Sequence, residues 1–179
     1  MKTLLCTTPK FGLFFVVAFL ALQATPAAAA DSGSGTYVGR LALSKVSLTF
    51  KDVYAFRAED PAYGPHTVVI LSASPLDKKA MTAALKKERD EKALNMDPYL
   101  AAYVRLVINQ KGKIGGYKLY SRGSSDSSPA GEGDAKVNTA KRVEGSFSHN
   151  YSGDKLDLQF ATDLADVGPG APVKMKSGL

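Results

Sequence analysis

Apolar side chains recur at every second position over most of the chain beyond residue 36. The pattern is cleanest at 156–160, where Leu, Leu and Phe alternate with polar residues, and at 104–108 Val, Leu and Ile fall on alternate positions. A period of two places the apolar set on one face of a β-strand. The chain is therefore predicted to consist mainly of strands that each bury one face.

Short polar segments separate the alternating runs and are expected to form turns. The segment 110–113 joins two runs into a hairpin, and 150–154 joins two more. Gly115 and Gly116 lie inside a returning strand, which indicates a bulge or a close backbone approach. The strands expected on this basis cover 37–44, 45–57, 68–71, 103–109, 114–121, 137–148 and 155–162. The strand at 68–71 is apolar on both faces and is expected to be covered on both sides.

The expected strand 45–57 contains one residue that conflicts with its pattern. Its apolar side chains, Tyr54 among them, fall on even positions, and Asp52 shares that side. Either a bulge or turn near Lys51 rotates Asp52 away, or a carboxylate faces the core, where it could be functional. We favour the bulge or a salt bridge with Arg57 or a lysine, because structural pairing explains most such residues.

One segment, Leu76 to Leu94, has the spacing of a helix. Asp77 can cap its N-terminus. Its apolar stripe consists of Ala80, Met81, Ala84 and Leu85. The second half, 86–92, is charged all round and is expected to project into water or fray. Asn95 and Pro98 end the helix.

The order of strands, one helix and further strands predicts an α+β, mainly β fold. We expect an antiparallel β-sandwich or a half-open barrel of about seven strands, with the helix Leu76 to Leu94 packed against it. The expected domain covers 37–164. A flexible leader at 31–36, a mobile Ser/Gly-rich loop at 122–136 and a flexible basic tail at 165–179 complete the prediction.

Residues 1–30 have the three parts of a cleavable secretory signal. Lys2 and Lys10 make the start positive, 11–22 is an apolar run, and 28–30 is Ala-Ala-Ala. The apolar run rises about 18 Å as a helix, short of the roughly 30 Å hydrocarbon core of a membrane. Cys6 precedes the run, so it is not placed for lipidation. We expect a periplasmic or secreted protein with no stable membrane anchor after cleavage.

Cleavage would remove the one cysteine, so the mature domain would have no disulfide. A cysteine-free exported domain of this size favours a bacterial origin. Two of the 23 basic residues lie in the signal, which leaves 21 against 17 acidic side chains. These charges are interspersed along 78–92 rather than gathered in a basic stripe, so the composition argues against nucleic-acid binding.

The sequence offers no set of catalytic residues. Without a mature cysteine there is no thiol nucleophile, and His66 and His149 have neither the spacing of a zinc site nor a nucleophile motif. No phosphate loop or calcium loop is present, and no cofactor is predicted. Tyrosines at strand ends could instead line a ligand cleft or a protein-binding face. The candidate binding residues are Asp52, Tyr54, His66, Tyr117 and His149.

Several segments together resemble small secreted or periplasmic bacterial proteins of unassigned function. They are 46–57 (VSLTFKDVYAFR), 68–76 (VVILSASPL), the Gly115-Gly116-Tyr117 stretch and 143–147 (VEGSF). The resemblance implies a compact, export-dependent domain and no activity. The chain does not resemble a lipocalin, because it has no tryptophan for the usual Gly-x-Trp start.

These features favour a non-enzymatic ligand-binding or protein-interaction module in the periplasm, with an unknown small ligand or protein as its partner. One alternative is a hydrolase of unrecognised type that uses His66 or His149. The other is an inhibitor or assembly protein that acts through the 122–136 loop or the charged segment 86–92.

Overall fold

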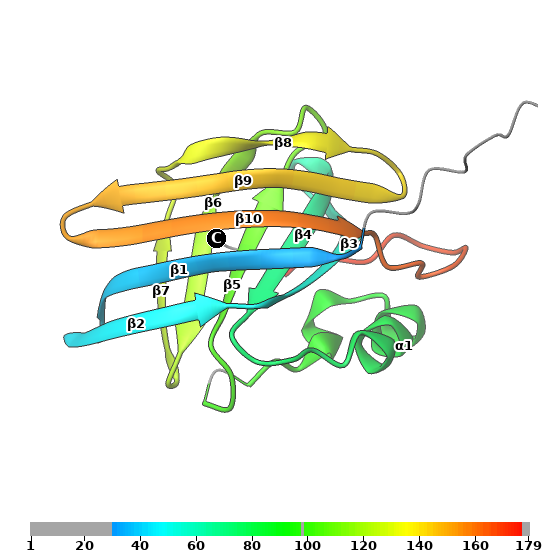
Figure 1. The fold of residues 1–179 in the computed structure, drawn as a ribbon. Coiled ribbons are helices and arrows are strands. Elements are labelled where there is room, and N and C mark those ends of the chain that lie inside the picture. The colour runs from blue at the N-terminus through cyan, green and yellow to red at the C-terminus, as the bar shows by residue number, and fades with distance from the viewer. Residues whose placement is uncertain (1–29, 98, 177–179) are drawn as a thin grey trace, which may run out of the picture.

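Ten strands form two five-stranded antiparallel sheets in the computed structural model, which describes residues 30–97 and 99–176. Sheet A has the order β2-β1-β10-β9-β8 and sheet B the order β3-β4-β5-β6-β7. The strands of one sheet cross those of the other (Figure 1). The strands are β1 (Ser32–Leu41), β2 (Ser44–Phe50), β3 (Asp52–Asp60), β4 (Gly64–Ser72), β5 (Tyr103–Ile108), β6 (Ile114–Ser121), β7 (Ser124–Ser128), β8 (Glu132–Asn138), β9 (Arg142–Tyr151) and β10 (Asp154–Asp163).

The mainly β, sandwich-like prediction with one helix is confirmed, but the expected number of strands is wrong. The segment predicted as one strand, 45–57, is two strands in different sheets, β2 and β3. The predicted loop 122–136 contains β7 and most of β8. These strands were missed because their side chains are small and polar, while their backbones pair with β6 and β9.

The chain turns from sheet A to sheet B at Lys51, and the turn reverses which side chains face inward. Phe50 belongs to the core between the sheets, whereas Tyr54 and Phe56 belong to a second core on the outer face of sheet B. The even-position pattern therefore does not mark one continuous face. The predicted irregularity near Lys51 is confirmed, and it moves Asp52 to the edge of the sandwich.

The core between the sheets is formed by the alternating residues. The pairs of β10 and β9 place Leu158 opposite Phe147, and both are almost fully buried. On β4, Val69 and Leu71 face this core while Val68 and Ile70 face the second one. The prediction that this strand is covered on both sides is confirmed.

The helix α1 (Lys78–Glu88) and the 3-10 helix η1 (Glu91–Leu94) cover the outer face of sheet B (Figure 1). Asp77 caps α1 by accepting a hydrogen bond from the Ala80 amide, as predicted. The single helix expected over 76–94 is wrong, because Arg89 adopts a left-handed conformation that ends α1. The expectation that 86–92 projects into water also fails at Glu91, which is buried. Pro98 lies outside the described residues.

The segment 165–176, which we call the strap, also packs on sheet B. Val173 is 1% exposed, and the Glu59 amide donates a hydrogen bond to its carbonyl. The guanidinium of Arg89 donates hydrogen bonds to the Gly168, Pro169 and Ala171 carbonyls. The segment predicted to be a flexible tail thus packs against sheet B over 165–176, and residues 177–179 lie outside the described part.

The leader expected to be flexible at 31–36 lies in β1 from residue 32 onward and pairs with β10. Its inward positions are Gly33 and Gly35, where a Cβ atom would meet Val53 or Leu158 at 2.5 Å. Because glycine has no side chain, Gly33 and Gly35 show no apolar alternation in the sequence. The same absence lets β1 approach its neighbours closely. The signal prediction falls on residues 1–29, outside the described part, apart from Ala30. No helix within the described ranges is long and apolar enough to cross a bilayer.

Gly115 and Gly116 form the predicted irregularity. The register of β5 and β6 shifts between Leu106 and Ile108, and Gly116 has a φ of 131°. A Cβ atom on Gly116 would lie 2.4 Å from the carbonyl oxygen of Ser128, so both a bulge and a close backbone approach are confirmed.

Gly116→Ala is therefore expected to lower the free energy of unfolding by about 3 kcal/mol, because backbone strain and a steric clash act together. Gly64→Ala is the matched control. Its φ is 75° but no atom lies within 4 Å of the new Cβ, so a loss of about 1 kcal/mol is expected. Urea denaturation of both variants measures the difference. Equal losses would contradict the assigned close approach.

Candidate functional site

The helices α1 and η1 and the strap together cover the outer face of sheet B, and we call them the cover. A pocket opens where η1 and the strap end. Its floor is formed by Tyr103 and Tyr120, which pair across β5 and β6, and by Arg105 of β5. Lys118, the cross-strand partner of Arg105, does not line the pocket but lies beside Tyr120. Because alternate residues of a strand share a face, all four side chains project to the same side. Tyr103 is buried, whereas Tyr120 and Lys118 are half-exposed.

The two tyrosine rings are stacked, with centroids 4.5 Å apart and planes 18° from parallel. Lys118 and Lys176 each bring an ammonium group near the Tyr120 ring, with Nζ 5.6 Å and 5.8 Å from the ring centroid. A cation at this distance is attracted by the π electrons of the ring. The aromatic pair is thus held in place and presents its partly exposed member between two cations.

A buried ion pair lies beside the aromatic pair and also lines the pocket. The Arg105 guanidinium donates two hydrogen bonds to Glu91, at 2.6 Å from Nε and 3.0 Å from Nη2. Their side chains are only 4% and 6% exposed. The backbone of Lys176 completes the arrangement, because its amide donates to Glu91 and its carbonyl accepts from Arg105. One pair of charges therefore joins β5, η1 and the strap.

The pocket has a volume of about 160 Å³ and is partly open to solvent. Its remaining walls are Ile70, Leu94, Met96, Asn95 and Lys92. Burial raises the pKa of the Tyr103 phenol and also that of Tyr120, so both are neutral at physiological pH. The phenols of Tyr103 and Tyr120 therefore give the pocket an uncharged wall that can form hydrogen bonds.

The net charge of the pocket is positive. Glu91 neutralises Arg105, and within residues 30–97 and 99–176 Lys92, Lys118 and Lys176 form no ion pair with an acidic side chain. Lys92 and Lys176, which line the pocket, and Lys118, which lies beside Tyr120, suit a ligand that carries a negative group.

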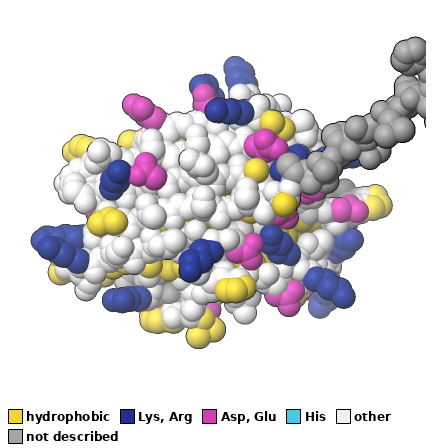
Figure 2. Space-filling view, in the orientation of Figure 1, with side chains coloured by type: hydrophobic (Ala, Val, Ile, Leu, Met, Phe, Trp, Pro, Cys, Tyr) yellow, Lys and Arg dark blue, Asp and Glu magenta, His cyan; other side chains and the backbone are white. Residues whose placement is uncertain are grey.

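A larger depression, of about 490 Å³, lies on the outer face of sheet A. It is lined mainly by small polar side chains such as Ser34, Thr36 and Ser146. Figure 2 shows this face as a broad area with few charged or hydrophobic side chains. It lacks the converging aromatic and cationic groups of the Tyr103–Tyr120 pocket and is the weaker candidate.

Two of the predicted site residues, Asp52 and Tyr54, connect sheet B to the helix. The Asp52 carboxylate accepts hydrogen bonds from the Val53 and Leu76 amides, both at 2.8 Å, and lies 3.1 Å from the Lys78 ammonium. The hydroxyl groups of Tyr54 and Thr82 are 3.0 Å apart. The predicted salt bridge of Asp52 with a lysine is confirmed, and the alternative of a core-facing carboxylate is wrong.

Tyr117 and His149 are brought together at one end of the core between the sheets, with ring centroids 5.2 Å apart. The Tyr117 hydroxyl donates to Asp126 at 3.2 Å, and Nδ1 of His149 lies 3.1 Å from the Ala130 carbonyl oxygen. His149 is 7% exposed and is therefore almost fully buried. These groups fill the core end rather than line the Tyr103–Tyr120 pocket.

His66 is half-buried at the start of β4, with Nδ1 2.8 Å from the Gly64 carbonyl oxygen. In the described part of the chain, neither His66 nor His149 is hydrogen-bonded to an acidic side chain or a hydroxyl group. The same residues contain no group of three or more potential metal ligands. The histidines thus lack the orienting partners that a hydrolase requires.

The pocket residues were missed for identifiable reasons. Tyr103 and Tyr120 were expected on the two strands of one hairpin, but the glycine bulge hides their register. Arg105 interrupts an apolar strand and could have indicated a buried ion pair. Its partner Glu91 lies in a segment that looks like a solvated helix, and Lys176 lies in a segment that looks like a tail.

Comparison of the chain with protein-family models, with curated proteins and with solved structures found no match in any of the three.

Glu91→Ala is expected to lower the free energy of unfolding by about 3 kcal/mol or more, because it removes the carboxylate that neutralises a buried guanidinium. Glu88→Ala removes a carboxylate from an exposed pair with Lys87 and is expected to cost at most about 0.5 kcal/mol. Urea denaturation separates the two. Similar losses would show that the Arg105–Glu91 pair does not hold the cover in place.

Asp52 is expected to make stability depend on pH. Burial opposes its ionisation, but the amides of Leu76 and Val53 and the Lys78 ammonium outweigh it and lower the pKa below 3.8. A lowered folded-state pKa adds stability above the unfolded pKa of about 4, which is lost as pH falls through the folded value. The deficit of Asp52→Asn in unfolding free energy should therefore shrink as pH falls from about 5 toward 2. A constant deficit would contradict this assignment.

Proposed function

We propose that this chain is a non-enzymatic binding module that acts in the periplasm or after secretion, and that its ligand occupies the Tyr103–Tyr120 pocket. One observation supports the proposal most strongly. A stacked tyrosine pair, partly exposed, is framed by lysines that have no acidic partner in the described residues, beside an ion pair that is already neutralised.

The dimensions of the pocket suggest the size of the ligand. A volume of about 160 Å³ is close to that of an apolar cavity that holds one benzene molecule. Tyr103, Leu94 and Met96 supply apolar surface, and Tyr120 offers a ring face and a hydroxyl group. A single six-membered ring matches this space better than an extended chain does.

The charges suggest the chemistry of the ligand. Lys92 and Lys176, which line the pocket, can pair with one carboxylate while the ring of the ligand contacts the tyrosines. We therefore propose a small cyclic carboxylate as the ligand class, either an aromatic acid or a sugar acid.

Binding is favoured over catalysis by what lines the pocket. Burial of Tyr103 and partial burial of Tyr120 raise the pKa of both phenols, and the Glu91 carboxylate is occupied by Arg105. The described lining residues therefore include no free carboxylate or histidine that could act as a general base.

Benzoate and galacturonate are suitable probes, with benzyl alcohol and inorganic phosphate as probes that lack either the charge or the ring. Calorimetric titration is expected to show binding of at least one cyclic acid and at least about tenfold weaker binding of both controls. Tyr120→Ala should weaken binding of that acid about tenfold, and Lys176→Gln about fivefold.

Tyr63→Ala and Lys79→Gln are the matched controls, because both residues are exposed and neither lines the pocket. Circular dichroism confirms that each variant is folded. Failure of both acids to bind, or equal weakening by pocket and control variants, would refute the proposal.

A further inference from the structure

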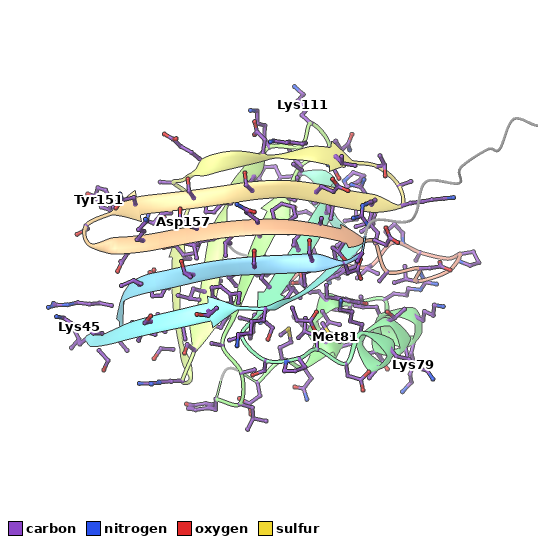
Figure 3. The ribbon with its side chains drawn as sticks, viewed as in Figure 1. Lys45, Lys79, Met81, Lys111, Tyr151 and Asp157 are labelled. Atoms are coloured by element: carbon purple, nitrogen blue, oxygen red, sulfur yellow. The ribbon has the colours of Figure 1, made fainter. Side chains whose placement is uncertain are left out.

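A second feature lies at one end of the sandwich, where two turns project together. The β1–β2 turn at Ala42 and Leu43 and the β9–β10 turn at 152–153 are neighbours because β1 pairs with β10. The Arg40 amide donates a hydrogen bond to Asp154 at 2.9 Å, which joins the bases of the two turns. Figure 3 shows Lys45 and Tyr151 at this same end of sheet A, on strands that β1 and β10 separate.

Large apolar side chains at this end are exposed to water. Leu43 is 95% exposed, Tyr151 is 73% exposed and Val38 is 53% exposed. Leu43 lies in the β1–β2 turn, Tyr151 is the last residue of β9 and Val38 is an outward residue of β1, so all three lie at the end of sheet A where the two turns project. Exposed apolar groups clustered on projecting turns indicate contact with another phase or molecule.

The backbone at Leu43 adds an independent observation. Ala42 and Leu43 have φ values of 48° and 67°, the left-handed conformation of a two-residue hairpin turn. Asparagine and glycine are preferred there, and a leucine is strained by its Cβ atom. Folding therefore does not account for leucine at this position, and strain of this kind accompanies functional sites.

Cations surround the apolar side chains. A shallow groove of about 380 Å³ is lined by Val38, Gly39, Val46 and Gly153, with Arg40 and Lys45 among its walls. Neither Arg40 nor Lys45 forms an ion pair with an acidic side chain of residues 30–97 and 99–176. Figure 2 shows Lys and Arg side chains beside hydrophobic ones at this end.

We propose that this hairpin tip, formed by Val38, Arg40, Leu43, Lys45 and Tyr151, binds reversibly to the surface of an anionic lipid bilayer. Leu43 enters the boundary between headgroups and acyl chains, and the Tyr151 ring lies at the headgroup level. Arg40 and Lys45 contact lipid phosphates, while their aliphatic stems extend along the apolar side chains.

A bilayer matches the tip better than a protein surface does. Two narrow turns present a convex point, whereas a stable protein interface needs a broad complementary area. An exposed leucine and an exposed tyrosine, at the end of the molecule that also carries Arg40 and Lys45, match the arrangement that inserts at a lipid interface. With few inserted groups the binding is weak, depends on anionic lipid and decreases as salt screens the phosphates.

Co-sedimentation of the mature protein with vesicles tests the proposal. Binding is expected to vesicles of phosphatidylcholine mixed with phosphatidylglycerol, and at least about fivefold less to phosphatidylcholine alone. Leu43→Asn should reduce binding about tenfold because it removes the inserted side chain. The same substitution should raise the urea midpoint, since asparagine tolerates the left-handed backbone. Opposite effects on binding and stability distinguish a functional leucine from a structural one.

Lys45→Glu should reduce binding to the mixed vesicles about tenfold, and Lys79→Glu is its control with the same change in net charge. Tyr63→Asn is the control for Leu43→Asn, because Tyr63 is 81% exposed at the β3–β4 turn. Absence of binding to the mixed vesicles would overturn the proposal. So would equal loss in the tip and control variants, or a protein complex that requires Leu43 in the absence of any vesicle binding.

Discussion

Both faces of sheet B must be kept from water, and much of the structure outside the two sheets follows from this constraint. The central strand β4 carries Val69 and Leu71 on one face and Val68 and Ile70 on the other. Sheet A covers the first face. The second requires α1, η1 and the strap, whose residues Met81, Leu85 and Val173 are buried against it. Burial of apolar surface provides the driving force, at roughly 25 cal/mol for each Å² removed from water.

The cover is held by polar contacts at its margin. Asp52 binds the start of the helix, Arg89 binds the strap, and Glu91 binds Arg105 at the pocket. Each is a charged group that satisfies backbone or side-chain partners of an element distant in sequence. Because the cover ends over β5, it leaves Tyr120 partly open beside its buried partner Tyr103. The proposed binding pocket is thus a consequence of where the cover stops.

The two proposed sites differ in how they depart from the rules of folding. The pocket concentrates cations that have no acidic partner among the residues the structure describes, near a buried ion pair. The hairpin tip places a leucine in a strained, solvent-exposed turn. Natural sequences are locally consistent with their folds, so departures of this kind are most informative about function. The two sites lie on different parts of the molecule, and each proposal can stand if the other fails.

The sequence by itself determined the β class, the hairpins with their inward alternation, the two-faced character of β4 and the helix cap at Asp77. These are local properties, set by a period of two and by side-chain chemistry over a few residues. Only the tertiary structure decided the reversal of faces at Lys51, the strands β7 and β8, the strap and the pairing of Arg105 with Glu91. Backbone hydrogen bonds between polar segments leave little pattern in side chains, and contacts between distant residues leave none. The candidate site was largely missed for the same reason. It is assembled from β5, β6, η1 and the strap, and no pattern within one segment indicates that these elements lie close together.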